Sequence, residues 1–199
     1  MYDFCKSSSN SANLDKYIPD VIIGDLDSLR DDVEDFYQSK GSSIIKEDEQ
    51  DTNDLEKSLR YLESTHGNSI ANLSVIILGG MGGRYDQEIA TMHILYKWTH
   101  RFSRMVVFNQ YSSAFLLLPG HLHEIVPVDG VEGPVCGLLP LGFAVSNIAT
   151  EGLQWNLANQ SLEMGKFVSS SNRLVAGAKF VRVVTSEPLL FTWAFSKNE

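Results

Sequence analysis

The stretch LLLPGHLHEIVPVDGVEGPVCGLLPLG, residues 116–142, divides the sequence into two parts of different texture. Glycine or proline recurs in it every few residues, and no helical period is present. Short apolar runs follow to the end of the chain, among them FVRVVT at 180–185 and LLFTWAF at 189–195. Short strands separated by glycine- and proline-rich turns are typical of an all-β domain. We therefore expect a β-sandwich over residues 119–199.

The part before this stretch alternates between aliphatic runs and helical patterns. Aliphatic runs occur at 21–23, 43–45, 73–78 and 105–108. The apolar residues between them have helical spacing: Leu29, Val33, Phe36 and Tyr37, then Leu55, Leu59 and Leu62, then Ile89, Met92, His93 and Tyr96. Alternating strands and helices favour a parallel sheet with flanking helices. We expect a Rossmann-like α/β domain over residues 1–118.

Composition restricts the class of protein. The chain has 199 residues, 43% of them hydrophobic and 21% charged, with a net charge of −9. That charge argues against nucleic-acid binding through bulk electrostatics, and no apolar run approaches the roughly 18 residues that cross a membrane. Cys5 and Cys136 do not make a disulfide framework, and the N-terminus lacks a secretory pattern. We expect a cytoplasmic protein.

Two aspartates stand one residue apart in IIGDLDSL, residues 22–29. In an extended segment Asp25 and Asp27 would present both carboxylates on one face, beyond the end of a strand. Magnesium prefers such hard oxygen ligands and often takes one or two carboxylates together with phosphate oxygens. The alternative is an Asx-type turn in which Ser28 caps the following helix.

A second group of acids lies in EDEQDTNDLEK, residues 47–57, again between a strand and a helix. Asn53 and Glu56 have the spacing of a capping box, and Asp54 stands where a carboxylate gains from the helix dipole. Helix capping explains one acid but not the crowding of the others: Glu47, Asp48, Glu49 and Asp51. Both acidic groups should lie at the same edge of the sheet, which favours a metal site.

The third element is LGGMGGRYDQ, residues 78–87, with four glycines in five positions. Such a backbone can approach a ligand closely and offer N–H groups to phosphate, and Arg84 can bind phosphate oxygens in bidentate fashion. We expect this loop to share the sheet edge of the acidic loops. It matches neither the P-loop nor the dinucleotide pattern. The alternative is a tight strand-to-helix turn with Asp86 as an acid at the helix start.

The β half offers an aromatic residue and a polar segment. Trp155 could form the wall of a small-molecule pocket, or it could be a core residue. Ser169, Ser171 and Asn172, in VSSSN at 168–172, could form the floor of that pocket, or they could simply make a polar turn. His121 and His123 alternate on one strand face; without a third ligand, such a pair is more often partly exposed than zinc-bound.

Taken in order, seven stretches resemble the eukaryotic thiamine pyrophosphokinase family, from about residue 17 to the end: GDLDSLRDDVEDFYQSKG, EQDTNDLEKSL, LGGMGGRYDQ, EGPVCGLLPLG, TEGLQWNL, VSSSN and PLLFTWAF. The resemblance implies an α/β domain followed by a β-sandwich. It implies transfer of a pyrophosphoryl group from ATP to thiamine, with Mg²⁺, giving thiamine diphosphate and AMP. It also implies a homodimer whose thiamine site lies between the α/β domain of one subunit and the β domain of the other.

The resemblance also assigns roles by position. Three carboxylates would be catalytic and would bind the metal: Asp25, Asp27 and Asp54. The nucleotide would be bound by a second set: Gln50, Asp51, Gly80, Gly82, Gly83, Arg84 and Gln87. Thiamine would be bound by the residues of the β half: Trp155, Ser169, Ser171 and Asn172. Asp54 or Asp27 would take the proton of the thiamine alcohol, and the sequence leaves that choice open.

The sequence departs from the family at its front. Family members carry an earlier segment like ADGGANRLYD with a further active-site aspartate, of which only Tyr2 and Asp3 have counterparts here. The expectation is a thiamine pyrophosphokinase-like chain that lacks its N-terminal segment. Two alternatives remain: a non-catalytic thiamine- or ATP-binding form, and another magnesium-dependent phosphoryl transferase.

Overall fold

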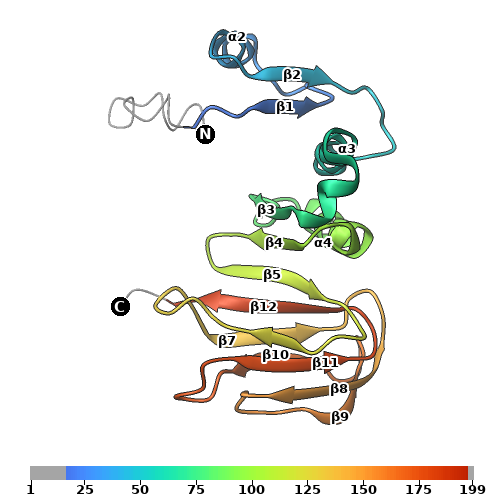
Figure 1. Cartoon of the computed structure of the whole chain (residues 1–199), viewed down its shortest axis with the longest axis vertical. Coiled ribbons are helices and arrows are strands. Elements are labelled where there is room, and N and C mark those ends of the chain that lie inside the picture. Colours follow the sequence, from blue (N-terminus) through green and yellow to red (C-terminus); the bar gives the residue numbers. More distant parts are fainter. Residues whose placement is uncertain (1–16, 197–199) are drawn as a thin grey trace. The chain divides into compact units, whose positions relative to one another are not determined.

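The computed structural model describes residues 17–196 (Figure 1). Tyr2, Asp3, Cys5 and the segment 6–13, which has the composition of a loop or tail, lie outside the described residues. The chain forms two compact units, a first unit of residues 1–67 and a second unit of residues 68–199. Each unit is described by itself.

The first unit is a β-α-β arrangement followed by a helix. Strands β1 (Val21–Gly24) and β2 (Ser43–Lys46) pair in parallel and are joined by helix α2 (Asp31–Ser39). Helix α3 (Asp54–His66) follows β2. The strands and helices predicted here are confirmed. Because Gly24 pairs with Lys46 at the carboxyl ends of the two strands, the two acidic loops leave the same edge of this sheet, as expected.

The two helices of the first unit begin differently. The Asn53 side chain caps α3 by accepting the N–H of Glu56 at 2.9 Å, which confirms the first half of the predicted capping box. Helix α2 instead has Arg30 at its N-cap with no side-chain cap. The proposed capping by Ser28 is therefore wrong, because a turn closed by the Leu29 N–H on the Leu26 carbonyl, at 3.1 Å, separates Ser28 from the helix.

The second unit begins with one more β-α-β arrangement. The 3₁₀ helix η2 (Gly67–Asn72) leads to strand β3 (Ser74–Leu78), helix α4 (Tyr85–Trp98), the 3₁₀ helix η3 (Thr99–Arg101) and strand β4 (Arg104–Phe108). Strands β3 and β4 pair in parallel. Leu95 on α4, and Met105 and Val107 on β4, are fully buried.

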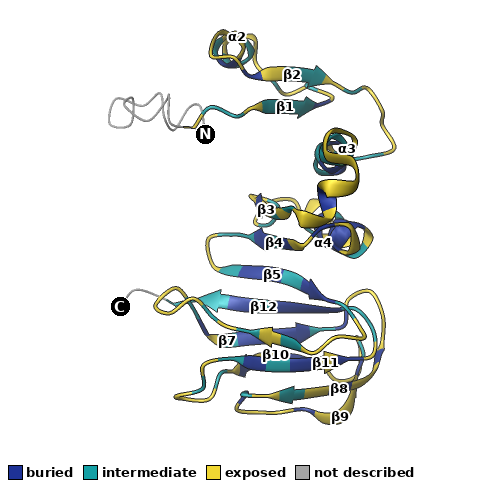
Figure 2. Ribbon diagram, viewed as in Figure 1, coloured by how far each residue is buried: buried dark blue, intermediate teal, exposed yellow. Residues whose placement is uncertain are grey.

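The remaining strands form the expected all-β part. They are β5 (Ser112–Leu117), β6 (His123–Ile125), β7 (Glu132–Leu139), β8 (Val145–Glu151), β9 (Ala158–Leu162), β10 (Ser169–Arg173), β11 (Val181–Thr185) and β12 (Leu189–Phe195). One sheet has six strands in the order β10-β7-β12-β5-β4-β3, and the other has four in the order β6-β11-β8-β9. Buried side chains of both sheets, such as Leu138, Ile148 and Phe191, make one core (Figure 2). Cys136 is a free thiol in this core, and burial raises its pKa to about 12.

One parallel sheet for the whole α/β part is a wrong prediction. The pair β1–β2 forms a sheet of its own, whereas β3–β4 belongs to the six-stranded sheet. Strand β3 is the end strand of that sheet, which continues from β4 to β5 and from β5 to β12, a partner far away in sequence that local periodicity does not reveal. The glycine loop after β3 therefore ends a strand of a different sheet from the acidic loops.

The same pairing affects the division of the chain. The six-stranded sheet contains strands from both sides of the predicted boundary at residues 118–119. The boundary between the two compact units lies at Gly67 instead. The division into 1–118 and 119–199 stays a prediction about function. Within residues 17–196, no helix is long and apolar enough to span a membrane.

Candidate functional site

The Asp25–Asp27 segment is a turn and not an extended strand end. The Asp25 Oδ1 accepts the N–H of Asp27 at 3.2 Å, an Asx-type hydrogen bond, and Leu26 has a left-handed φ of 61°. The assumption that both carboxylates share one extended face is therefore wrong, because the strand ends at Gly24. A leucine in this conformation costs roughly 1–2 kcal/mol, and such conformations cluster at functional sites.

Asp54 is the residue at which the two acidic loops meet. Its Oδ1 accepts a long hydrogen bond from the Asp25 N–H at 3.4 Å, and its side chain is 59% exposed. Gly24 makes this approach possible: a Cβ at that position would lie 2.9 Å from both Cγ and Oδ1 of Asp54. Only glycine leaves room for the carboxylate where it stands.

Lys57 belongs to the same cluster, and the sequence reasoning missed it. Its side chain is only 2% exposed, and its Nζ donates to the Asp54 Oδ1 at 3.2 Å. The signal was present, because Asp54 and Lys57 are three residues apart at the start of a helix and so lie on the same face. A buried ammonium beside an exposed carboxylate is suited to a ligand that carries both negative oxygens, which the ammonium attracts, and a cation, which the carboxylate attracts.

The rest of the acidic loop is mostly surface. Asp48 pairs with Lys46 at 2.8 Å and Glu49 with Arg60 at 2.7 Å, in exposed ion pairs that contribute little to stability. Gln50 is exposed, as is Asp51. The hydroxyl of Thr52 is buried without a hydrogen-bond partner in the described structure, which makes it a further polar group of this loop.

The fit to a metal is partial. Among residues 17–196 there is no group of three His, Cys, Asp or Glu side chains placed to hold a metal ion, so Asp25, Asp27 and Asp54 are not assembled into one three-carboxylate site. The exposed carboxylates of Asp25 and Asp54 do stand on adjacent loops. Their chemistry fits Mg²⁺ that takes its other ligands from phosphate and water.

In the second unit, the amides of the glycine loop bind a carboxylate. The N–H groups of Gly82 and Gly83 donate to Oε1 of Glu88, at 2.9 and 3.1 Å. The loop therefore does present convergent donors to a negative oxygen, as the sequence predicted. Glu88, which the prediction did not include, occupies them. Gly80 has a packing role, because a Cβ there would meet the Thr91 side chain at 3.0 Å.

Arg84 is engaged locally as well. Its guanidinium binds Asp86 in bidentate fashion, with Nη2–Oδ2 at 2.6 Å and Nε–Oδ1 at 3.2 Å. Hydrogen bonding to Asp86 raises the pKa of Arg84, and hydrogen bonding to Arg84 lowers the pKa of Asp86. Both side chains are exposed, so the pair can open to admit a phosphate. Gln87, on the first turn of α4, is exposed beside them.

A cavity of about 420 Å³ adjoins this loop. Its walls come from the glycine loop and from the turn between β4 and β5: Leu78, Gly79, Met81 and Gly82, then Phe108, Asn109, Gln110 and Tyr111. The second set was not predicted from the sequence. Asn109 fixes the turn, since its Oδ1 accepts the N–H groups of Tyr111 and Ser112, both at 2.8 Å.

On the β side, Asn172 organises the predicted group. It is 2% exposed, and its Nδ2 donates to the Trp155 carbonyl at 2.8 Å and to the Ser169 Oγ at 2.9 Å. Its Oδ1 accepts the N–H groups of Trp155 at 3.3 Å and Arg173 at 2.8 Å. The structure thus brings Trp155, Ser169 and Asn172 together, but both ends of the Asn172 amide are used to hold the Trp155 backbone.

Trp155 itself is a surface residue. It is 55% exposed, so the alternative that it is a core residue is wrong. Ser171 is exposed with a left-handed φ of 58°, in the irregular part of β10 between Ser169 and Asn172. An exposed aromatic ring fixed through its backbone offers a flat surface for a ring-shaped ligand.

Asn172→Ala is expected to destabilise the chain by about 2–3 kcal/mol, because several buried polar groups lose their partner. Urea unfolding followed by circular dichroism measures the change. The exposed Asn147→Ala is the matched control and should shift the free energy of unfolding by less than about 0.5 kcal/mol. Equal effects of the two substitutions would contradict the bridging role of Asn172.

Acidic loops at strand ends, a glycine loop whose amides bind an anionic oxygen and an exposed tryptophan in a turn of the β part are typical of a small-molecule transferase built from α/β and β parts. The family model "Thiamin pyrophosphokinase, catalytic domain" matches residues 5–108, and "Thiamin pyrophosphokinase, vitamin B1 binding domain" matches residues 122–190. The chain belongs to the thiamine pyrophosphokinase family.

Relatives and solved structures agree with this assignment. The chain is 37% identical to Thiamine pyrophosphokinase 1 of Oryza sativa subsp. japonica and 38% identical to Thiamine pyrophosphokinase 1 of Arabidopsis thaliana, over 89% and 92% of its length. It spans 66% and 68% of the lengths of those relatives. The crystal structure of yeast thiamin pyrophosphokinase is similar with a TM-score of 0.83 and 25% identity, covering 98% of this chain and 74% of that one. The Candida albicans structure gives 0.81 and 25%, covering 94% and 77%.

Proposed function

We propose that the chain is a thiamine pyrophosphokinase that transfers the pyrophosphoryl group of ATP to the hydroxyl of thiamine, giving thiamine diphosphate and AMP. The observation that carries the proposal is the presence, in one chain, of both the catalytic and the vitamin B1 binding patterns of the family. Residues 1–118 would act as the Rossmann-like nucleotide part and residues 119–199 as the thiamine part.

The acidic loops provide the groups for phosphate chemistry. Asp25 and Asp54 would hold Mg²⁺, with Asp27 beside them, and the ion would supply neutralisation of the phosphate charge. The ion pair of Lys57 Nζ with Asp54 Oδ1, at 3.2 Å, holds the Asp54 carboxylate in place. Asp54 or Asp27 would accept the proton of the thiamine hydroxyl. Gln50 and Asp51 lie on the same loop and would contact the phosphates.

The remaining residues would bind the two substrates. The amides of Gly82 and Gly83 would release Glu88 and bind a phosphate oxygen instead. Arg84 would likewise release Asp86 and bind a phosphate oxygen. Gly80 and Gln87 shape the same loop. On the β side the Trp155 ring would stack on thiamine, whose positive charge favours an aromatic face. Ser169 and Ser171 would make its polar contacts, with Asn172 as their support.

The assay is AMP release from thiamine and magnesium ATP by the purified chain, with thiamine diphosphate quantified by chromatography. Equimolar AMP and thiamine diphosphate are expected. ADP in place of AMP would favour another phosphoryl transferase, and calorimetric binding of thiamine without turnover would favour the non-catalytic form. We propose in addition a cytoplasmic homodimer, for which sedimentation equilibrium should give twice the mass of one chain.

Glu88→Gln is expected to tighten ATP binding about fivefold, which corresponds to roughly 1 kcal/mol. The amide oxygen can still accept the Gly82 and Gly83 N–H groups, but the negative charge that competes with phosphate is gone. Calorimetric titration with magnesium ATP measures the affinity. Glu163→Gln, which removes an exposed charge paired with Lys166, should leave the affinity unchanged. Weaker binding by Glu88→Gln would show that Glu88 supports the nucleotide site and does not compete for it.

A further inference from the structure

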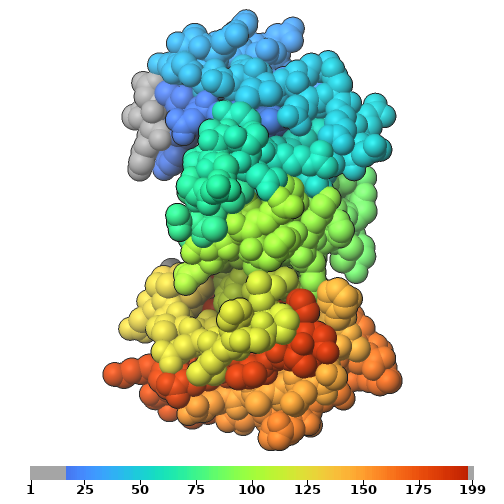
Figure 3. All heavy atoms as spheres, turned by 45° about the vertical axis from the view of Figure 1, so that its right-hand side comes forward, coloured from blue at the N-terminus to red at the C-terminus, as the bar shows by residue number. Residues whose placement is uncertain are grey.

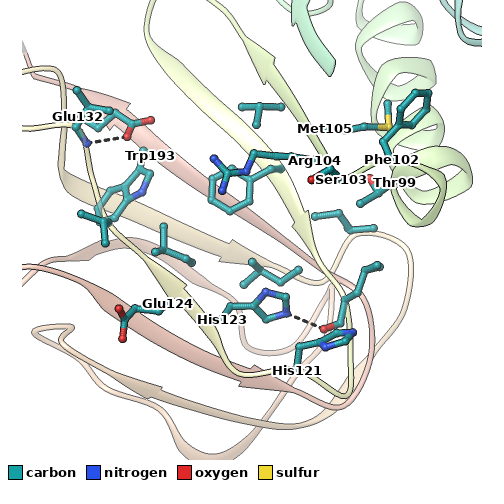
Figure 4. Close-up of a pocket in the computed structure, with 18 of the residues that line it drawn as sticks. Thr99, Phe102, Ser103, Arg104, Met105, His121, His123, Glu124, Glu132 and Trp193 are labelled. Carbon is teal, nitrogen blue, oxygen red and sulfur yellow. Dashed lines mark hydrogen bonds between the residues drawn. The ribbon is translucent and has the colours of Figure 1, made fainter. Parts of the chain in front are cut away.

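A cavity of about 550 Å³ lies in the second unit and has no role in the proposed reaction. It is bordered by β4, β5 and β12 and by the segment from Leu118 to Glu132 (Figure 4). The surface is hollowed between the light-green and yellow segments of this unit (Figure 3). It shares only Phe108 with the cavity beside the glycine loop, and none of the residues proposed to bind ATP or thiamine lines it. Its volume is within the range of small-molecule sites.

The walls of this cavity are largely apolar. Val106, Phe115 and Leu117 come from the six-stranded sheet, and Ile125 comes from β6 of the other sheet. Leu122, on the connection before β6, is an exposed apolar residue at the same cavity. Filling the cavity with an apolar body would remove the remaining exposed surface of these side chains from water, which is favourable.

Two buried polar groups of the lining lack a partner. Trp193 is 1% exposed and its Nε1 makes no hydrogen bond to the described residues; the same holds for the buried Oγ1 of Thr99. Figure 4 shows the Trp193 ring at one end of the cavity, with its nitrogen on the side that faces the other lining residues. A buried donor without an acceptor is costly, and a ligand with an acceptor atom would recover that cost.

The charged side chains of the lining are one guanidinium, that of Arg104, and two carboxylates, those of Glu124 and Glu132, and they differ in whether they have a partner. Arg104 makes no ion pair with any described carboxylate, and Figure 4 shows its guanidinium reaching over the cavity. The carboxylates of the lining are already engaged. Glu124 binds Arg182 at 2.9 Å, and Glu132 accepts the Ser113 hydroxyl at 2.9 Å and the Val128 N–H at 3.0 Å.

Two histidines of the lining lie at the segment before β6. The Nε2 of His123 lies 2.7 Å from the Leu118 carbonyl, so this nitrogen carries a proton and donates. The His121 ring meets that of His123 edge to face, with centroids 6.1 Å apart. Among the described residues no third His, Cys, Asp or Glu joins these two histidines, which the sequence singled out, in a metal-binding group. They border the cavity.

We propose that this cavity binds a small molecule with an aromatic or aliphatic body and one anionic group, of the aryl carboxylate or aryl sulfonate class. The body would lie against Phe115 and Leu117, the anionic group would bind Arg104, and an acceptor atom would take the Trp193 N–H. None of the residues proposed to bind thiamine lines the cavity, so the site is separate from that of the proposed substrate.

Two matched fluorescent probes test the proposal on the full chain. 1-Anilinonaphthalene-8-sulfonate has the anionic group, and N-phenyl-1-naphthylamine has the same apolar body without it. We expect saturable one-to-one binding of the sulfonate. Arg104→Gln should weaken it about tenfold, since a charge-assisted hydrogen bond is lost, and should leave the neutral probe unaffected. Trp193→Phe, which keeps a ring but removes the N–H, should weaken the sulfonate about threefold.

Arg101→Gln is the control, because Arg101 is three residues before Arg104 and does not line the cavity. Equal effects of Arg101→Gln and Arg104→Gln, the same loss for both probes, or no saturable binding would overturn the proposal. So would displacement of the sulfonate by saturating thiamine or magnesium ATP, which would place the probe in the substrate sites. Since Arg104 is exposed, its variant tests the proposal even where Trp193→Phe does not fold.

Discussion

Asp54→Asn is expected to lower kcat for thiamine diphosphate formation, the proposed activity, by about 100-fold or more, which is the size of loss that follows when one electrostatic group is removed from a transition-state site. The Asp54 carboxylate is the only side chain that contacts both the Asp25 backbone and the Lys57 ammonium within the described residues of the first unit. The substitution keeps the shape and one acceptor oxygen but removes the charge. Steady-state AMP release at saturating thiamine and magnesium ATP measures the change.

Asp48→Asn is the matched control for this substitution. Asp48 belongs to the same acidic loop but makes only an exposed ion pair with Lys46. Its variant should retain activity within about twofold and should unfold at an unchanged urea concentration, because exposed pairs contribute about 0–1 kcal/mol. If Asp54→Asn retained wild-type activity, or if both variants lost activity equally, Asp54 would have no specific role in the proposed reaction.

Local patterns in the sequence predicted the elements that carry these residues. The aliphatic runs near 22 and 44 and the apolar face of Leu55, Leu59 and Leu62 are short-range signals, and the structure has β1, β2 and α3 there. The Asn53 cap was predictable for the same reason, since it joins residues three apart. The meeting of the two acidic loops followed from parallel pairing alone.

Long-range pairing and competing side chains could not be predicted in this way. No periodicity shows that β4 pairs with β5 while β1 and β2 form a separate sheet. The glycine pattern predicted amides that bind an anion, but it did not reveal that Glu88 from the following helix already satisfies them. Asn172 was predicted as a ligand contact from the polar segment 168–172 and from the resemblance to the family; its burial depends on the Trp155 segment, 17 residues away.

Gly24→Ala is expected to lower kcat/KM by roughly 10- to 100-fold while the chain stays folded, because a displacement of about 1 Å of a reacting group has effects of this size. The new Cβ would lie 2.9 Å from Cγ and Oδ1 of Asp54, closer than real contacts allow. Gly24 does not have a left-handed φ, so alanine fits the backbone. The Asp54 side chain is largely exposed and can rotate away, so the free energy of unfolding should change by less than about 1 kcal/mol.

The double variant Gly24→Ala/Asp54→Asn separates placement of the carboxylate from other effects of the added methyl group. If Gly24 matters only because it leaves room for Asp54, the double variant should be no less active than Asp54→Asn alone, since residues in contact are not additive. An additive loss would mean that the methyl group acts elsewhere, for example on the neighbouring Asx turn at Asp25. Urea unfolding of all three variants must show intact folding for the comparison to hold. Non-additivity would establish that the position of the Asp54 carboxylate, and not only its charge, limits the reaction.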